Sequence, residues 1–318
     1  MSARYLVLAG GLSHERDVSL RSGRRVLDAL RSAGVEADLR DADASLLDVV
    51  AETSAGAHPY DAVLVALHGG AGEDGALREV LDVAGVPHVG SPPAACRIAW
   101  DKPTAKALAL RAGVSTPASV VLPHAAFREL GASAVLDRLV GHLGLPLMVK
   151  PARGGSALGT NRVDKPDELP SAMVSCFSYG EAALVEQFVE GTELAVTVVD
   201  TGDGPRALPP VEIVPLSGIY DYTARYTAGQ TEFYCPARLS EDVAAAVAEA
   251  AVLAHTALGL RDLSRVDLIV DAAGVVQLLE VNTAPGMTET SLLPMAVDAA
   301  GLSLGALLRD LLDRAADR

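Results

Sequence analysis

Two β-prone segments around a short turn constrain this chain more than any other feature. Residues 265–270 read RVDLIV, residues 275–282 read VVQLLEVN, and DAAG (271–274) separates them. This pattern predicts an antiparallel hairpin with Val270 opposite Val275, which places Asp267 opposite Leu278. Because side chains alternate along a strand, one face is polar and the other is apolar. The polar set is Arg265, Asp267, Glu280 and Asn282, and the apolar set is Val266, Leu268, Val270, Leu279 and Val281.

The polar face of this hairpin offers oxygen ligands for a divalent cation. Two carboxylates and an amide form the all-oxygen set that Mg²⁺ takes, often together with substrate phosphate oxygens. The alternative is an exposed hairpin with solvated charges. We favour the metal site because the apolar face has to be buried, which turns the polar face toward a cleft, and because Asn282 is one of only two asparagines. A three-residue loop would shift the register and remove this argument.

Composition and charge exclude several classes of protein. Half of the 318 residues are apolar, enough for one large or two to three small packed domains. The formal net charge of −15 repels nucleic acid and anionic lipid, so we expect neither nucleic acid nor a membrane as a partner. The three cysteines have neither disulfide nor zinc spacing, and the N-terminus lacks a secretory pattern, which predicts a cytoplasmic location.

The order of apolar runs predicts an α/β protein with three parts. Residues 1–92 begin with a β-α-β unit and form a Rossmann-like domain. Residues 93–190 and 191–318 form a central and a C-terminal α+β lobe, with a polar loop at 218–236 and a final helix at 303–315. Strands outside the hairpin are expected at 5–8, 35–39, 62–67, 86–89, 119–122, 146–151, 183–188, 193–199 and 211–215.

A glycine-rich loop follows an apolar strand in residues 149–159 (VKPARGGSALG). Its glycines let backbone N–H groups approach an anion closely. It lacks the G-K-[ST] of a Walker A loop, and AGGLSHE near the N-terminus lacks G-x-G-x-x-G, so neither nucleotide fingerprint applies. Lys150 ends the strand, and a buried ammonium needs a partner such as phosphate. The alternatives are an ordinary hairpin loop and, for Lys102, a solvated surface position.

Taken in order, these and further segments resemble the D-alanine:D-alanine ligase family, which has the ATP-grasp fold. The resemblance covers essentially the whole chain, and the order of its segments is highly specific. The segments are GGLSHERDVS (10–19), LHGGAGEDG (67–75), GS (90–91), DK (101–102), VKPARGGSALG (149–159), VEQFVEGTEL (185–194), YDYTARY (220–226), YCPA (234–237), RVD (265–267) and EVNTAPGMTETSLLP (280–294).

The resemblance implies ATP-dependent ligation of two D-alanines through an acyl phosphate, for peptidoglycan precursor synthesis. Two Mg²⁺ (or Mn²⁺) ions would bind at Asp267, Glu280 and Asn282. Arg265 and the backbone N–H of Gly286 would stabilise the oxyanion of the tetrahedral step. The implied ATP contacts are Lys102 and Lys150 at the phosphates, Glu193 at the ribose, and the backbone of Glu186, Phe188 and Val189 at the adenine.

The same resemblance implies a site for the amino acids. Glu15 would pair with the ammonium of the first D-alanine, with His68 nearby. Ser291 and Leu292 would hold the carboxylate of the second. A hydrogen-bonded set would tie a mobile loop over the site and keep water from the acyl phosphate. That set is Glu15, Ser156 and Tyr226. Singly, these residues have plainer explanations, such as Ser291 as a helix N-cap.

Three residues depart from the family pattern. Arg225 stands where lysine is usual, so a planar fork replaces a compact ammonium beside the substrates. Ala157 stands where serine is common, and His88 where tyrosine is common. These departures leave the preferred amino acids open, although Tyr226, which related depsipeptide ligases lack, favours an amine over a hydroxy acid.

Three other functions were weighed against D-alanine ligation. An ATP-grasp ligase of a specialised pathway with a different amino-acid substrate stays open because of these departures. A non-catalytic ATP sensor would have no need of an oxyanion stabiliser such as Arg265. A dinucleotide oxidoreductase has only the N-terminal β-α-β pattern in its favour. The resemblance also implies a homodimer.

Overall fold

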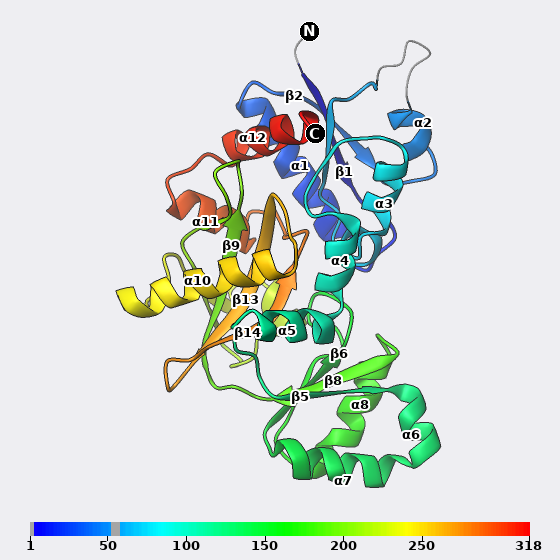
Figure 1. Ribbon diagram of the computed structural model, residues 1–318, viewed down its shortest axis with the longest axis vertical. Coiled ribbons are helices and arrows are strands. Elements are labelled where there is room, and N and C mark those ends of the chain that lie inside the picture. Colours follow the sequence, from blue (N-terminus) through cyan, green and yellow to red (C-terminus); the bar gives the residue numbers. More distant parts are fainter. Residues whose placement is uncertain (1–2, 52–57) are drawn as a thin grey trace.

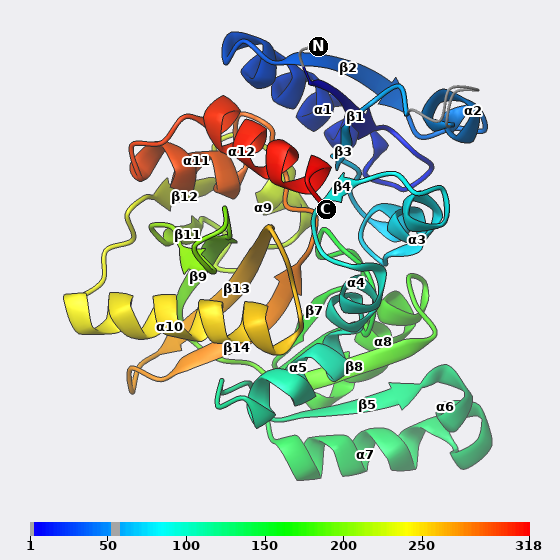
Figure 2. The same cartoon turned by 45° about the horizontal axis from the view of Figure 1, so that its top comes forward.

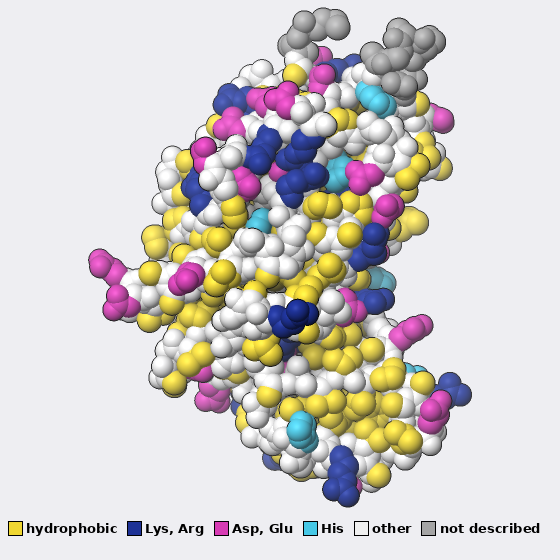
Figure 3. Space-filling view, in the orientation of Figure 1, with side chains coloured by type: hydrophobic (Ala, Val, Ile, Leu, Met, Phe, Trp, Pro, Cys, Tyr) yellow, Lys and Arg dark blue, Asp and Glu magenta, His cyan; other side chains and the backbone are white. Residues whose placement is uncertain are grey.

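Three β-sheets, each built from a consecutive part of the chain, organise the structure (Figure 1). The computed structural model describes residues 3–51 and 58–318, apart from the side chain of Tyr226. Within these ranges, no single helix is long and apolar enough to cross a membrane. Only helices α11 (Leu292–Ala299) and α12 (Leu304–Ala316), bent by 104° against each other, pass that test as a pair. In Figure 3, Lys and Arg side chains lie among Asp and Glu side chains on the visible face.

The first sheet is parallel with strand order β2-β1-β3-β4. Its central strand is continuously apolar, and Leu6, Val7 and Leu8 are fully buried, as expected for a parallel sheet covered on both faces. Helix α1 turns Val26, Leu27 and Leu30 inward at helical spacing. The elements are β1 (Arg4–Ala9), α1 (Arg16–Ser32), β2 (Glu36–Asp41), α2 (Leu46–Val50), β3 (Ala62–Val65), η1 (Gly70–Gly72), α3 (Ala76–Val83) and β4 (His88–Val89).

The second sheet is antiparallel with order β5-β8-β6-β7. Leu147 and Val149 of β6 and Ala183 and Val185 of β8 pack against apolar residues of three helices. The glycine-rich loop connects β6 to β7. The elements are β5 (Ser119–Pro123), α6 (His124–Leu130), α7 (Ala132–Leu143), β6 (Leu147–Pro151), β7 (Asn161–Val163), η2 (Pro166–Glu168), α8 (Leu169–Phe177) and β8 (Ala182–Gln187).

The third sheet is antiparallel with order β12-β11-β9-β13-β14, and β10 pairs with β9. One face is covered by α10 together with α4 and α5, and α11 packs on the other (Figure 2). The elements are α4 (Pro93–Trp100), α5 (Lys102–Arg111), β9 (Gly191–Val199), β10 (Arg206–Ala207), β11 (Val211–Pro215), α9 (Tyr222–Tyr226), β12 (Thr231–Tyr234), α10 (Glu241–Ala257), β13 (Leu263–Asp271), β14 (Val276–Asn282), α11 (Leu292–Ala299) and α12 (Leu304–Ala316).

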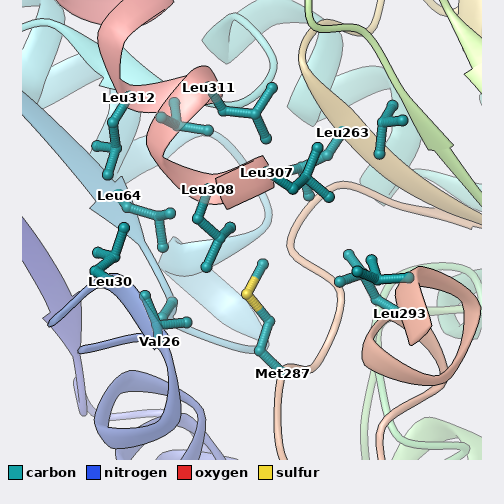
Figure 4. Close-up of a cluster of buried hydrophobic side chains, with 14 of the residues drawn as sticks. Val26, Leu30, Leu64, Leu263, Met287, Leu293, Leu307, Leu308, Leu311 and Leu312 are labelled. Carbon is teal, nitrogen blue, oxygen red and sulfur yellow. The ribbon is translucent and has the colours of Figure 1, made fainter. Parts of the chain in front are cut away.

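One apolar cluster joins the two ends of the chain (Figure 4). Leu308 and Leu312 of α12 lie against Leu30 and Leu64 of the first sheet layer, and Met287 of the loop after β14 belongs to the same cluster. All five side chains are nearly inaccessible to solvent. The first and third sheets therefore share a core, and this core holds the loop after β14 in place.

The division of the chain at residues 92 and 190 remains a prediction. Each sheet falls inside one predicted range, but the helices do not follow the same limits. Ala105 and Ala109 of α5, inside the predicted central range, pack with Val266 and Leu278 of the third sheet. The predicted polar loop at 218–236 is wrong in part, because it contains α9 and β12. Elements of five and four residues are too short for a clear periodic signal.

The predicted hairpin register is wrong by one residue at the turn and by two at the far end. Val270 pairs with Val276, and Asp267 pairs with Glu280, because a β-bulge lies between Asp267 and Leu268 on one strand and Leu279 on the other. As a result Leu278 is fully buried in the core, whereas Leu279, predicted on the apolar face, lines a cavity. The bulge leaves Asp267, Glu280 and Asn282 on the polar side and brings the two carboxylates into direct opposition.

This corrected register predicts different costs for two neighbouring leucines. Leu278→Ala opens a cavity in the core of the third sheet and is expected to lower the free energy of unfolding by about 3 kcal/mol. Leu279→Ala removes a half-buried cavity wall and is expected to cost less than about 1 kcal/mol. Denaturant titration of both variants measures the difference. A larger loss for Leu279→Ala than for Leu278→Ala would contradict the bulged register and favour the regular alternation predicted without it.

Candidate active site

Two cavities lie side by side between the sheets. The first has a volume of about 400 Å³ and lies between the second and third sheets; we name it the nucleotide cavity for the ligand that the sequence resemblance implies. The second, about 460 Å³, lies between the first and third sheets and is named the amino-acid cavity on the same ground. Both are lined by Lys102, Gly154, Gly155, Tyr220, Arg225 and Glu280, so these residues form the boundary at which the two spaces meet.

The predicted site residues are distributed between these two cavities. Arg225 and Glu280, like Lys102, belong to both. The nucleotide cavity is also lined by Lys150, Glu186, Phe188, Val189, Glu193 and Asp267. The amino-acid cavity is also lined by Glu15, His68, Ser156, Arg265, Asn282, Gly286, Ser291 and Leu292. The side chain of Tyr226 lies outside the described residues, so its predicted role stays a prediction.

Lys102 starts α5 at the boundary of the two cavities. Asp101 caps this helix through the backbone N–H of Thr104 at 3.1 Å, which fixes the direction of its first turn. The Lys102 ammonium donates to the carbonyl of Gly154 at 2.6 Å and lies 3.4 Å from Glu280 Oε2. The helix start thereby links the glycine-rich loop to β14. The alternative of a solvated surface lysine is wrong, because Lys102 is only 8% exposed.

Lys150 has a carboxylate partner inside the chain. Its Nζ lies 2.5 Å from Glu186 Oε1 on the neighbouring strand β8, and Lys106 of α5 pairs with Glu186 Oε2. Burial alone would raise the pKa of Glu186, but the two ammonium groups outweigh it and lower that pKa. Glu186 is therefore an anion with two cations, and Lys150 is bound to it at the wall of the nucleotide cavity.

The polar face of the hairpin forms a compact charged group. Arg265 donates two hydrogen bonds to Asp267, at 2.7 and 2.8 Å, in a bidentate pair. Burial would raise the pKa of Glu280, but the charges of Lys102 and Arg225 and of two further cations lower it instead. The amide oxygen of Asn282 accepts from the backbone N–H of Ala284 at 2.8 Å, which orients it.

This donor set fits divalent cations. Asp267 and Glu280 face each other in the ladder, Asn282 follows two residues later on the same strand, and all three offer oxygen ligands. Within residues 3–51 and 58–318 there is no group of three or more His, Cys, Asp or Glu side chains suited to a metal. The predicted set contains only two carboxylates, so its third ligand would be the amide of Asn282. The lowered pKa of Glu280 keeps that carboxylate ionised at neutral pH.

Glu193 of β9 also lines the nucleotide cavity. Burial, opposed in part by Arg225 and reinforced by the charges of Asp267 and Glu280, raises the pKa of Glu193 to about 7. At neutral pH this carboxyl group is therefore both a hydrogen-bond donor and an acceptor. Such a group suits neighbouring hydroxyls, in agreement with its predicted place at a ribose.

Arg225 is held at the boundary by the aromatic ring of Tyr220. Its guanidinium carbon lies 4.4 Å from the ring centroid, and its Nε donates to the Tyr220 carbonyl at 3.2 Å. Tyr220 in turn packs edge-on against Phe233, with ring centroids 6.2 Å apart. Two contacts to one residue therefore fix the fork of Arg225 and leave its terminal nitrogens toward the cavities.

Glu15 reaches the glycine-rich loop across the amino-acid cavity. Ser156 donates a short hydrogen bond to Glu15 Oε1, which connects the first sheet to the second. Gly69 makes room for this carboxylate, because a Cβ there would lie 2.2 Å from Glu15 Oε2. Ser156 and Ala157 both have positive φ, 53° and 55°, a conformation that costs energy for residues other than glycine. Two of the three members of the predicted hydrogen-bonded set are thus in contact.

His68 connects helix α1 to the loop after β14. Its Nδ1 lies 2.9 Å from the carbonyl of Ala284, so this nitrogen carries the proton, and Nε2 accepts from the Ser22 hydroxyl at 2.8 Å. Ser22 also accepts from the backbone N–H of Met287 at 3.1 Å. Burial lowers the pKa of His68 to about 4, so the ring is neutral. These contacts fix the backbone on both sides of Gly286.

Ser291 lies at the start of α11 but does not act as a side-chain N-cap. Its hydroxyl instead accepts from the backbone N–H of Thr288 at 2.9 Å and lies 2.8 Å from the Thr288 hydroxyl. A Cβ on Gly286 would approach the Ser291 hydroxyl to 2.8 Å, so the backbone passes close to it only because residue 286 is glycine. The plainer explanation of Ser291 as a helix cap is therefore wrong.

Three polar residues of the site were missed in the sequence. Glu73 lies buried in the amino-acid cavity, where burial and the charge of Glu15 raise its pKa. Lys106 lies one helical turn after Lys102, a spacing that puts both on one face of a helix and could have revealed it. For Tyr220, the only signal in the sequence was its position in the segment YDYTARY.

The fold defines the class of protein. The structure aligns with that of VanG D-Ala:D-Ser ligase from Enterococcus faecalis with a TM-score of 0.83 and 28% identity, over 99% of this chain and 100% of that one. It aligns with D-alanine–D-alanine ligase from Bacillus anthracis complexed with ATP with a TM-score of 0.78 and 28% identity, over 99% and 97%. The chain has the ATP-grasp fold, which confirms the predicted fold class.

Sequence comparison defines the family. Residues 108–313 match the family model described as D-ala D-ala ligase C-terminus. The D-alanine–D-alanine ligase of Bordetella petrii is 42% identical over 310 residues, which cover 98% of this chain and 91% of that protein. The chain belongs to the D-alanine–D-alanine ligase family, and it is a ligase, as the sequence resemblance predicted.

Because His68 is buried and neutral, we expect the fold to become less stable in acid. Its pKa is about 4 in the folded chain against 6.5 as the ordinary value, so stability is complete above pH 6.5 and falls as the pH drops toward 4. Between pH 7 and pH 5, protonation of this histidine in the unfolded chain is expected to lower the free energy of unfolding by about 2 kcal/mol. His68→Gln should remove that part of the pH dependence in denaturant titrations at both pH values. His14→Gln, at an exposed position, is the control, and parallel pH curves for all three proteins would contradict the prediction.

Proposed function

We propose that this enzyme joins two D-alanines to D-alanyl-D-alanine at the expense of ATP, for peptidoglycan precursor synthesis. The observation that carries the proposal is the shared boundary of the two cavities at Lys102, Arg225 and Glu280. A phosphate in one cavity and a carboxylate in the other would meet there. We take D-alanine as the amino-acid substrate because relatives in this family are named D-alanine–D-alanine ligase.

In this proposal ATP occupies the nucleotide cavity. The backbone at Glu186, Phe188 and Val189 would bind the adenine, and Glu193 the ribose. Lys102, Lys150 and Arg225 would bind phosphate oxygens and balance their charge. Asp267, Glu280 and Asn282 would hold two Mg²⁺ (or Mn²⁺) ions, which when bound neutralise phosphate charge.

The amino-acid cavity would hold both D-alanines. The first binds its ammonium at Glu15, near His68, and its carboxylate takes the terminal phosphoryl group of ATP. The amine of the second then attacks the acyl carbon, and phosphate leaves. Arg265 and the N–H of Gly286 would stabilise the oxyanion between these steps. Ser291 and Leu292 would hold the carboxylate of the second D-alanine.

The contact between Glu15 and Ser156 supports closure of the glycine-rich loop over the reacting groups. Tyr226 would complete this set. Exclusion of water protects the acyl phosphate from hydrolysis. We further propose a homodimer in the cytoplasm, without nucleic acid or membrane partners, in keeping with the family resemblance and the net charge of −15.

D-Serine is a second candidate for the amino acid that supplies the amine. The structural similarity to a D-Ala:D-Ser ligase, with a TM-score of 0.83, favours including it. Arg225 lines both cavities, so its replacement of lysine lies beside the space in which this substrate would bind. Ala157 lines only the nucleotide cavity, but it follows Ser156, which lines the amino-acid cavity.

Phosphate release across a panel of substrates tests the function. With ATP, Mg²⁺ and D-alanine the purified enzyme is expected to release phosphate and form a dipeptide, identified by mass spectrometry. L-Alanine should support less than about 1% of that rate, because a mirror-image substrate leaves buried polar groups unpaired. D-Serine and D-lactate are tested with D-alanine as the first substrate. The proposal would be rejected if another amino acid or hydroxy acid supported phosphate release and D-alanine did not.

Glu280→Gln tests the metal set. The substitution keeps the size and removes the charge, so turnover is expected to fall at least about a hundredfold while the melting temperature changes little. Glu289→Gln, at an exposed position of the following loop, is the matched control and should retain activity. Near wild-type turnover of Glu280→Gln at every Mg²⁺ concentration would refute the metal assignment.

A further inference from the structure

Lys106 is a buried cation to which the proposed mechanism gives no task. Its side chain is only 4% exposed, and its ammonium pairs with Glu186 Oε2. Within the described part of the chain, Lys106 is not among the residues that line either cavity, whereas its partner Glu186 lines the nucleotide cavity. Lys106 therefore acts on a bound nucleotide only through its neighbours.

The neighbours of Lys106 form a closed group of three charges. Glu186 accepts Lys106 on one carboxylate oxygen and Lys150 on the other, the latter at 2.5 Å. Its own side chain is 3% exposed, and that of Lys150 is 10% exposed. Burial lowers the pKa of Lys106, while the charge of Glu186 opposes this effect. Because solvent hardly reaches the group, its charges act on one another and on the adjacent cavity with little screening.

The net charge of these three side chains determines how strongly this wall of the nucleotide cavity attracts a phosphate group. Lys150 and Glu186 alone would form a neutral pair, and Lys150 would have little net attraction for an anion. With Lys106 the three side chains carry a net charge of +1. A second lysine behind the carboxylate thus leaves the positive charge of Lys150 available to the nucleotide.

We propose that Lys106 is a positioning residue that balances the charge of Glu186 and so lets Lys150 bind the ATP phosphates. The inference rests on the proposed function for the location of those phosphates. It assigns a role to the second lysine of DKPTAK, on the same face of α5 as Lys102. It also explains why a carboxylate is tolerated beside a phosphate site.

The test measures the affinities of ADP and adenosine by calorimetry, without amino acids. The ratio of the adenosine dissociation constant to that of ADP reports the contribution of the phosphates alone. A general disturbance of the fold or of the adenine contact weakens both ligands equally and therefore cancels in this ratio. Lys106→Met is expected to lower this ratio about tenfold. Lys106→Arg keeps the charge and should stay within about threefold of the parent protein.

Removal of the carboxylate supplies the decisive comparison. Lys106→Met combined with Glu186→Gln again leaves a net charge of +1, so the ratio should return to within about threefold of the parent value, and Glu186→Gln alone should raise it. If Lys106→Met does not fold, Lys106→Gln takes its place in the same cycle. An unchanged ratio in the single variant, or no recovery in the double variant, would overturn the proposal. Because no ligation is measured, failure of the proposed D-alanine activity is seen separately in the phosphate-release assay.

Discussion

The pairing of buried charges around the two cavities is the constraint on which the rest of this structure depends. A buried ion without a partner is costly, so each one has to find an opposite charge or a set of hydrogen bonds. Here the partners come from distant parts of the chain. Glu186 of the second sheet pairs with Lys106 of α5, and Lys102 of the same helix approaches Glu280 of the third sheet. The ion pairs beside the nucleotide cavity therefore also connect the sheets that enclose it.

Packing and hydrogen bonds to neutral groups fix the backbone around Gly286. Met287 is buried in the core shared by α1 and α12, and its N–H bonds to Ser22, which also bonds to His68. The loop that contains Gly286 is consequently fixed from both sides by neutral groups. A neutral histidine at this point adds no positive charge to a region that already contains Arg265, and its low pKa is the result of that burial.

The sequence predicted which hairpin residues share the polar side better than it predicted their register. Alternation grouped Asp267, Glu280 and Asn282, and that grouping holds because Glu280 and Asn282 are two residues apart on one strand and Asp267 pairs with Glu280. The bulge at Leu279 was not predictable, since a regular pattern contains no sign of an inserted residue. The spacing of Lys106 to Lys102 could have placed it on the same helix face, but its partner Glu186 is 80 residues away, and pairing over such a distance is a property of the fold. Glu73 was missed because its burial depends on how distant loops pack around the amino-acid cavity.

The replacement of lysine by Arg225 shows how a local change is accommodated by what surrounds it. A lysine ammonium is compact and binds from any direction, whereas a guanidinium binds well only when its plane is set. Tyr220 supplies that plane through its ring and its carbonyl, and Phe233 supports the ring from the side. The fork is thus oriented before a substrate arrives, so the entropy of ordering a long side chain is spent in folding rather than in binding. An oriented guanidinium discriminates between anions by their shape as well as by their charge. Arg225 lines both cavities, so this discrimination would act at their shared boundary.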